Sequence, residues 1–287
     1  MVDVKPYPAS VRWLLGWSYL LTLPLAACAP SLATMQGAHV AQPGHFAGTA
    51  ALEVGVPTNT LTRVIDAGTT LAEAAENRML TPDEQRQVFE AGVTLAASPP
   101  AFGPHLMLAY VPIKNLEANL RSAGGGWRLG ARYQLLSHED GPFDLTVGLG
   151  GSRSTYKLPI PDIIPFLEIK DFTRYSVDVP VLIGTSRSWF RVWIGPRFLY
   201  SSYSTSMQFA PPTTTVDLAT FKGSSVYFGG QTGFAVGYKH VFFGVELTVT
   251  KMSGSAHVTV PSQVATIAPF DFSGWVIYPT FGLMAEI

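Results

Sequence analysis

The chain has 287 residues, of which 47% are hydrophobic and only 14% charged, and its formal net charge is -1. About a quarter of the residues of an average soluble domain are charged, so this composition is unusual for a protein that faces water on all sides. The near-zero net charge, without a basic cluster, excludes nucleic acid as a partner. The single cysteine excludes an internal disulfide.

The N-terminal region has the order of a secretory signal. A positively charged start precedes an apolar stretch over residues 13–25, and small residues follow. The ending Leu25-Ala26-Ala27-Cys28 resembles the lipobox of bacterial lipoproteins. That resemblance implies a lipoprotein signal peptide over residues 1–27, cleavage before Cys28, and a covalent lipid on Cys28 as the only cofactor. Ordinary secretory cleavage beside an incidental cysteine is the alternative.

Residues 28–43 are interpreted as the acylated N-terminus and a short linker, and residues 44–287 as the folded unit. In the folded unit, short segments alternate between apolar and polar residues. The clearest runs from Trp127 to Leu135, with Trp, Leu, Ala, Tyr and Leu on one parity and Arg, Gly, Arg and Gln on the other. A strand places alternate side chains on opposite faces. An apolar outside around a polar inside is what a barrel in lipid needs.

The alternating segments predict about ten strands, within limits of eight to twelve. The expected strands cover residues 44–56, 102–112, 115–123, 126–137, 142–155, 172–184, 188–204, 224–238, 241–252 and 274–287. The predicted fold class is therefore an all-β, antiparallel transmembrane β-barrel.

Residues 57–101 are predicted to form a helical hairpin in the first outer loop of this barrel. Apolar residues recur at every third or fourth position from Leu61 to Met79. The sequence Thr81-Pro82-Asp83-Glu84 is typical of a helix start, with a capping Thr, Pro at the first position and a Glu that reaches back. The sequence leaves open whether the hairpin covers the mouth of the barrel or folds into it.

The lengths of the connections predict an orientation. The short connections are at 113–114, 138–141, 185–187 and 239–240, and the longer ones at 57–101, 156–171, 205–223 and 253–273. Outer-membrane barrels have short periplasmic turns and longer outer loops. We therefore expect an integral outer-membrane protein with both termini in the periplasm, and a lipid on Cys28 in the inner leaflet.

The last eight residues resemble the C-terminal assembly signal of outer-membrane barrels. The signal has a polar residue, a glycine two positions later and alternating hydrophobic residues, which correspond here to Thr280, Gly282, Ala285 and Ile287. The resemblance implies that the barrel assembly machinery inserts the chain. Ile287 stands where an aromatic residue is usual, and a simple edge strand is the alternative.

The polar parity assigns five acidic and six basic residues to the lumen: Glu53, Glu117, Asp144, Asp178, Glu246, Arg121, Arg128, Arg132, Arg174, Arg191 and Arg197. A barrel of about eight strands is just wide enough for its own side chains. Because an unpaired buried charge is costly, we expect an internal network of ion pairs in a closed barrel. The alternative is a selective pore with an Arg-rich constriction that favours anions.

Three functions follow as hypotheses. The combination of barrel and lipobox resembles uncharacterised barrel lipoproteins of Gram-negative bacteria, which implies a non-catalytic scaffold held in outer-membrane lipid. Residues 57–101 and 156–171 are the expected contacts for an envelope protein partner. The second hypothesis is a narrow porin-like channel, and the third is a lipid-modifying enzyme. For the third, only His105 and His257 are expected on the outer side, no carboxylate is predicted beside either, and no metal-ligand spacing occurs.

Overall fold

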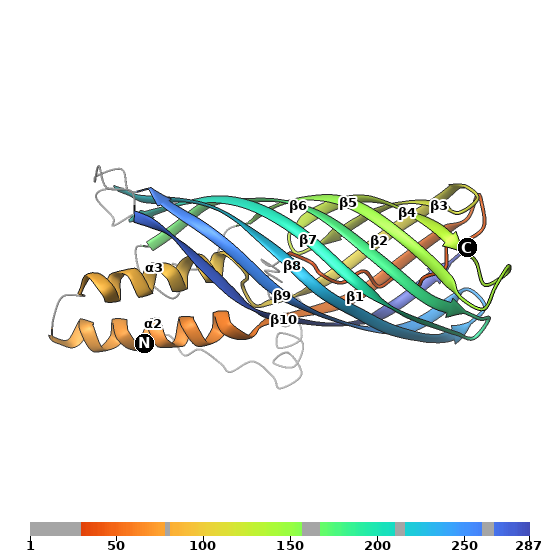
Figure 1. Ribbon diagram of the computed structural model, residues 1–287, viewed down its shortest axis with the longest axis horizontal. Helices are drawn as coiled ribbons and strands as arrows, with labels where there is room; N and C mark the ends of the chain where they lie inside the picture. Colours follow the sequence, from red (N-terminus) through yellow and green to blue (C-terminus); the bar gives the residue numbers. More distant parts are fainter. Residues whose placement is uncertain (1–29, 78–80, 157–166, 210–215, 260–266) are drawn as a thin grey trace, which may run out of the picture.

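The computed structural model describes residues 30–77, 81–156, 167–209, 216–259 and 267–287. In these residues ten antiparallel strands form one closed barrel, in which each strand pairs with the next along the chain and β1 closes against β10 (Figure 1). The predicted fold class is confirmed. The strands are β1 (Phe46–Pro57), β2 (Ala101–Ile113), β3 (Leu116–Ala123), β4 (Gly126–Leu136), β5 (Asp144–Tyr156), β6 (Leu167–Ser186), β7 (Phe190–Phe209), β8 (Val216–Tyr238), β9 (Val241–Thr259) and β10 (Ile267–Glu286).

The outer surface of the barrel is apolar. On β4, Trp127 and Leu129 are 63% and 69% exposed, whereas Arg128 and Arg132, on the other parity, are buried in the lumen. The same alternation continues around the sheet, and the exposed large side chains of the other strands are mostly Leu, Val, Ile, Phe and Tyr. A lipid bilayer solvates such a surface, whereas water does not.

The barrel has two rims with different connections. The turn rim carries the short turns that join β2 to β3, β4 to β5, β6 to β7 and β8 to β9, together with Phe46 and Glu286. The opposite rim, here called the hairpin rim, carries the two helices that connect β1 to β2 and the turn at Gly124 and Gly125. In Figure 1 the helices project from one end of the barrel and the C-terminus lies at the other.

Strands β6 to β10 are longer than the sequence predicted. They have 19 to 23 residues, whereas a tilted strand crosses a bilayer in about 9–11. Their additional residues extend toward the hairpin rim through parts of the segments expected as loops at 156–171, 205–223 and 253–273. Outward-facing residues of these extensions, such as Lys222, Ser253 and His257, are polar. The apolar parity that marks a lipid-facing strand is therefore missing there, which is why the prediction ended too early.

Two helices follow β1, as predicted. They are α2 (Thr58–Asn77) and α3 (Pro82–Ala97). Thr81 caps α3: its side chain accepts a hydrogen bond from the Glu84 backbone, and the Glu84 side chain accepts one from the Thr81 backbone. This reciprocal capping satisfies two N–H groups that the first turn leaves free. Among the described residues, no helix is long and apolar enough to cross a membrane.

Candidate functional site

The interior of the barrel is filled by the chain that precedes β1. Residues 30–43, here called the lumen segment, run through the lumen from the turn at Gly124 to the turn rim, and Leu32, Ala33 and Met35 have no exposed surface. The sequence predicted a short linker here, which is wrong because the segment is packed inside the barrel. The segment contains no Asp, Glu, Lys or Arg. A solvated linker is usually more polar, so this composition is the signal that was missed.

Glu246, on β9, anchors the lumen segment. Its carboxylate accepts hydrogen bonds from the Thr34 backbone (2.6 Å) and hydroxyl (2.7 Å) and from the Met35 backbone (3.0 Å). Trp193 on β7 donates its indole N–H to the same carboxylate at 2.9 Å. Glu246 is fully buried. A buried carboxylate is stable when several donors surround it, so these four bonds hold the segment to the barrel wall.

Arginines on the opposite wall bind the carbonyl groups of the same segment. Arg121 donates to the Ala33 carbonyl. Arg132 donates to the Gly37 carbonyl at 2.7 Å and forms an ion pair with Glu117 at 2.6 Å. Glu117 in turn accepts a hydrogen bond from the Gln36 side chain at 2.9 Å. The lumen segment is therefore held by the Glu246 carboxylate on one side and by two arginines and Glu117 on the other.

A second cluster of charges joins three strands beside the segment. Asp178 on β6 lies 2.6 Å from the Nε of Arg128 on β4 and 3.1 Å from the guanidinium of Arg197 on β7. Gly130 and Gly150 lie directly against the Arg128 guanidinium, where a Cβ atom would overlap it. All three charged groups are buried. One carboxylate thus pairs with two arginines, and the two glycines provide the space for one of them.

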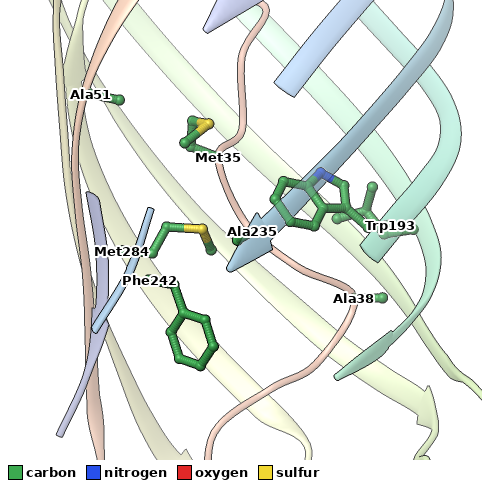
Figure 2. Close-up of a cluster of buried hydrophobic side chains, with 8 residues drawn as sticks. Met35, Ala38, Ala51, Trp193, Ala235, Phe242 and Met284 are labelled. Atoms are coloured by element: carbon green, nitrogen blue, oxygen red, sulfur yellow. The ribbon is translucent and has the colours of Figure 1, made fainter. Parts of the chain in front are cut away.

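The lumen segment also contributes to an apolar core. Met35 and Ala38 pack with inward-facing residues of the wall, and Figure 2 shows Met284, Phe242 and Trp193 around the chain that carries them. The wall residues of this cluster are Ala51, Leu182, Trp193, Ala235, Phe242 and Met284. Burial of apolar surface contributes about 25 cal/mol per Å², so these contacts stabilise the segment in addition to its polar bonds.

The helical insert enters the other end of the lumen. The carbonyl of Ala97, the last residue of α3, accepts hydrogen bonds from Arg174 at 2.6 Å and from the Tyr227 hydroxyl at 3.1 Å. Thr94 and Ser98 are buried beside it. A cation at a helix C-terminus is favourable because it opposes the negative end of the helix dipole. The end of the hairpin therefore folds into the mouth of the barrel, while the rest of it projects outward (Figure 1).

Two carboxylates at the turn rim, those of Glu286 and Asp144, have polar partners. Arg191 forms an ion pair with Glu286 at 2.6 Å, and its guanidinium lies over the Phe242 ring. Asp144 accepts hydrogen bonds from the Gln134 side chain and from the His138 backbone, both at 2.8 Å. Gln134 also accepts a hydrogen bond from the Val40 backbone of the lumen segment at 3.0 Å. The rim and the segment are thus connected through one glutamine.

Glu53, the remaining lumen carboxylate, lies beside a histidine. His105 Nδ1 is 3.3 Å from the Glu53 carboxylate, and Ser31 donates its hydroxyl to the same carboxylate at 2.7 Å. His105 and Glu53 have no exposed surface. The sequence predicted no carboxylate beside His105, which is wrong, because the structure buries this histidine in the lumen against Glu53. His257 lies on the outer face of β9, where Lys222 is its partner on β8.

The residues of the expected assembly signal lie along the seam between β1 and β10. Thr280 faces the lumen between Glu53 and Glu246. Gly282 lies so close to Ala50 and Ala51 that a Cβ atom would overlap their backbone. Ala285 is the β10 partner of Gly48, and Ile287 and Phe46 exchange two backbone hydrogen bonds of 2.8 and 2.9 Å. Cys28, the expected lipidation site, lies outside the described residues.

The lumen contains the charged residues that the alternation of polar and apolar positions predicted there. Their hydrogen-bonding partners could not be read from that alternation. The residues missed were Thr34, Gln36, Trp193 and Gln134, which connect the segment to the wall. Trp193 and Gln134 occupy lumen-facing positions in the alternation, so their parity was a usable signal. Nothing in the sequence of strands alone indicated that a chain segment would occupy the space between them.

Comparison with solved structures finds outer-membrane barrels at low similarity. OprG from Pseudomonas aeruginosa has 10% identity, with 86% of this chain and 97% of that chain covered and a TM-score of 0.37. Ail from Yersinia pestis has 7% identity, 86% and 100% coverage and a TM-score of 0.29. Neisserial surface protein A has 10% identity, 84% and 95% coverage and a TM-score of 0.29. No family model and no curated protein sequence matches the chain.

The class of the protein follows from its own architecture. A closed antiparallel barrel with an even number of strands, an apolar outer surface and a polar lumen is the form of integral outer-membrane proteins. A closed sheet satisfies every backbone hydrogen bond in lipid, whereas an open sheet leaves the groups of its edge strands unpaired. The chain is an outer-membrane β-barrel protein whose lumen is occupied by its own N-terminal residues.

Proposed function

We propose that the protein is a closed, non-conducting barrel that anchors and displays its helical hairpin as a scaffold of the cell envelope. The observation that carries this proposal is the occupied lumen, with the lumen segment inside the barrel and the end of α3 at the hairpin rim. The lumen segment and the end of α3 each form hydrogen bonds with buried charged residues of the barrel. These contacts favour a stable closed state over a transport pathway.

A planar bilayer tests this proposal. We expect the full chain, refolded in detergent and inserted into a bilayer, to give no steady conductance steps in potassium chloride. Faster gel migration of the unboiled sample provides the control that the barrel is folded. Steady, salt-dependent steps from the folded protein would contradict the closed state and favour the narrow channel, with anion selectivity as its next test.

The geometry supports a non-catalytic role. The Ser31 hydroxyl donates to the Glu53 carboxylate, and His105 contacts the same carboxylate. A hydroxyl with a base within reach acts as a nucleophile only where a substrate can enter. His105 is fully buried in the lumen, away from lipid and solvent. We therefore propose no catalytic function for this group, and none for the exposed His257.

We also propose that Cys28 carries the lipid that the lipobox implies. Pro30, the second residue after Cys28, lines a pocket with Gly124 and Trp127, at the end of the lumen segment away from the turn rim. We therefore propose that the lipid lies toward the hairpin rim, whereas the sequence predicted it on the side of the turn rim, in the inner leaflet.

Metabolic labelling tests the lipid. Cells that express the protein and receive an alkyne analogue of palmitate are expected to incorporate the label into the wild-type chain and not into Cys28→Ser. Because Cys28 is the only cysteine, label that remains in the variant would have to lie at another kind of residue, and equal labelling of the two chains would refute acylation at this site.

The helical hairpin is the proposed contact for an envelope protein. Leu61 and Ile65, one turn apart on α2, are 39% and 66% exposed. Apolar side chains that remain exposed together often mark a contact surface. Under the orientation that the connection lengths favour, with the turn rim in the periplasm, this surface lies outside the cell. Of the expected contact at 156–171, only the ends that belong to β5 and β6 are described.

A further inference from the structure

Two histidines and an aspartate from separate parts of the chain meet at the turn rim. His39 belongs to the lumen segment, His138 to the connection between β4 and β5, and Asp144 is the first residue of β5. One ligand atom from each lies within 4.8 Å of the other two. We propose that these three residues bind a divalent transition-metal ion, for which Zn²⁺ has the best-matched chemistry.

The geometry is close to that of a bound metal. His138 Nδ1 lies 2.8 Å and 3.0 Å from the two oxygens of Asp144. The rings of His39 and His138 meet edge to face, with centroids 5.2 Å apart. Ligands at about 2.0–2.2 Å from a tetrahedral Zn²⁺ lie a little over 3 Å apart, so a small movement of the His39 ring completes the arrangement.

The nitrogen atoms of His39 are suitably placed. Within the described residues, His39 Nδ1 is buried and has no hydrogen-bond partner, while its Nε2 lies 3.6 Å from the Glu286 carboxylate. Metal-binding histidines usually donate their other ring N–H to a carboxylate or a carbonyl. Glu286 would therefore orient His39 with Nδ1 toward the ion, and Gln134 orients Asp144 by its hydrogen bond to Oδ1.

The set of donors selects the ion. Two neutral imidazoles and one carboxylate suit Zn²⁺ and similar transition metals, whereas Mg²⁺ prefers oxygen ligands and retains its waters. His39 and His138 also border an open cavity of about 430 Å³ at the turn rim, which gives the ion access from solvent. Arg191, which lines the same cavity, is already paired with Glu286, and this pairing reduces its repulsion of the ion.

The ion would connect the lumen segment to the wall. His39 is on the segment, while His138 and Asp144 are on the barrel, so one ion bound by all three joins two parts of the chain that are about one hundred residues apart. A ligand that binds only the folded state stabilises it. The site therefore makes retention of the segment dependent on metal, and this inference holds whether or not the barrel is a scaffold.

Zinc titration of the full chain tests the site. The probe is Zn²⁺ added to the folded, chelator-treated protein in detergent, with a chromophoric zinc indicator as competitor. We expect one Zn²⁺ per chain and a rise in the temperature at which the unboiled gel band is lost. Changes to the surroundings of a metal ligand cost 10–100-fold in affinity, so His39→Ala and His138→Ala should each weaken binding at least about tenfold.

The controls come from the same cavity. His45→Ala and His240→Ala remove histidines that line it without belonging to the cluster, and they should leave zinc affinity unchanged. Mg²⁺ in place of Zn²⁺ should not raise the transition temperature. An excess of Mg²⁺ should also not displace Zn²⁺ from the protein to the indicator. Absence of stoichiometric zinc binding, or equal loss from the cluster and control variants, would overturn the proposal. His39→Gln preserves the polarity of the segment and serves if the alanine variants fail to fold.

Discussion

Replacement of Glu246 by alanine is expected to release residues 30–43 from the lumen. The change removes the acceptor of four hydrogen bonds, three from the lumen segment and one from Trp193. The donors left behind are buried and lose their partner, at a cost of about 1–3 kcal/mol for each unsatisfied group. The segment contains no charged residue that would pair elsewhere in the wall. We therefore expect the segment to exchange between bound and free states.

Cysteine accessibility measures this release. Ala38 is 2% exposed in the lumen, so an Ala38→Cys change in a Cys28→Ser background places one reporter on the segment. A polyethylene glycol maleimide should label this cysteine slowly in the parent and at least about tenfold faster after Glu246→Ala, as a loss of 1.4 kcal/mol already implies.

Thr248→Ala is the matched control for this experiment. Thr248 faces the lumen two residues away on the same strand, and in the described structure its hydroxyl has no hydrogen-bond partner. Labelling of the Thr248→Ala protein should remain as slow as in the parent. Equal labelling rates for Glu246→Ala and its parent would show that the carboxylate does not hold the segment.

Asp178→Asn is expected to lower the stability of the barrel strongly. The substitution preserves the shape of the side chain but removes the negative charge that pairs with Arg128 and Arg197. Removal of one partner from a buried ion pair costs about 3–5 kcal/mol, because the other charge remains buried without compensation. The midpoint of urea unfolding, followed by the loss of the fast-migrating gel band in detergent, should fall accordingly.

An exposed ion pair provides the comparison for Asp178. Arg86 and Glu90 form an ion pair at 2.9 Å on α3, with the Arg86 side chain 60% exposed. Pairs of this kind contribute about 0.3–0.5 kcal/mol, so Glu90→Ala should leave the urea midpoint almost unchanged. If the two variants shift the midpoint equally, the lumen charges contribute no more than surface charges, and the interior is more hydrated than its burial indicates.

Much of the fold was predictable because its constraints act locally. The alternation around Trp127 and Leu129 reports a strand with lipid on one side, since each residue needs only its own environment to be apolar. The capping box at Thr81 and Glu84 was predictable for the same reason, because both partners lie within one turn of helix. Where the environment changed, as in the polar extensions of β6 to β10, the prediction of strand ends failed.

The partners of the lumen charges were less predictable. Parity selects which side chains enter the lumen, but the match of Arg132 with Glu117 depends on the register of β3 against β4. Asp178 and Arg197 are not direct partners across β6 and β7, because Asp178 lies opposite Leu199. Their side chains meet diagonally between the two strands. Register is a sum of many weak pair preferences along both strands, and a single sequence does not reveal it.

The sequence determined the ten-stranded apolar wall, the polar lumen and the helical insert, because those features follow from the period of the pattern and from short-range capping. Only the tertiary structure decided what occupies the lumen. The hydrogen bonds of Thr34 to Glu246 and of Gln36 to Glu117 join residues separated by 212 and 81 positions. No local pattern records contacts at that separation. The closed barrel encloses a narrow polar space, and the uncharged segment fills it without burying an unpaired charge.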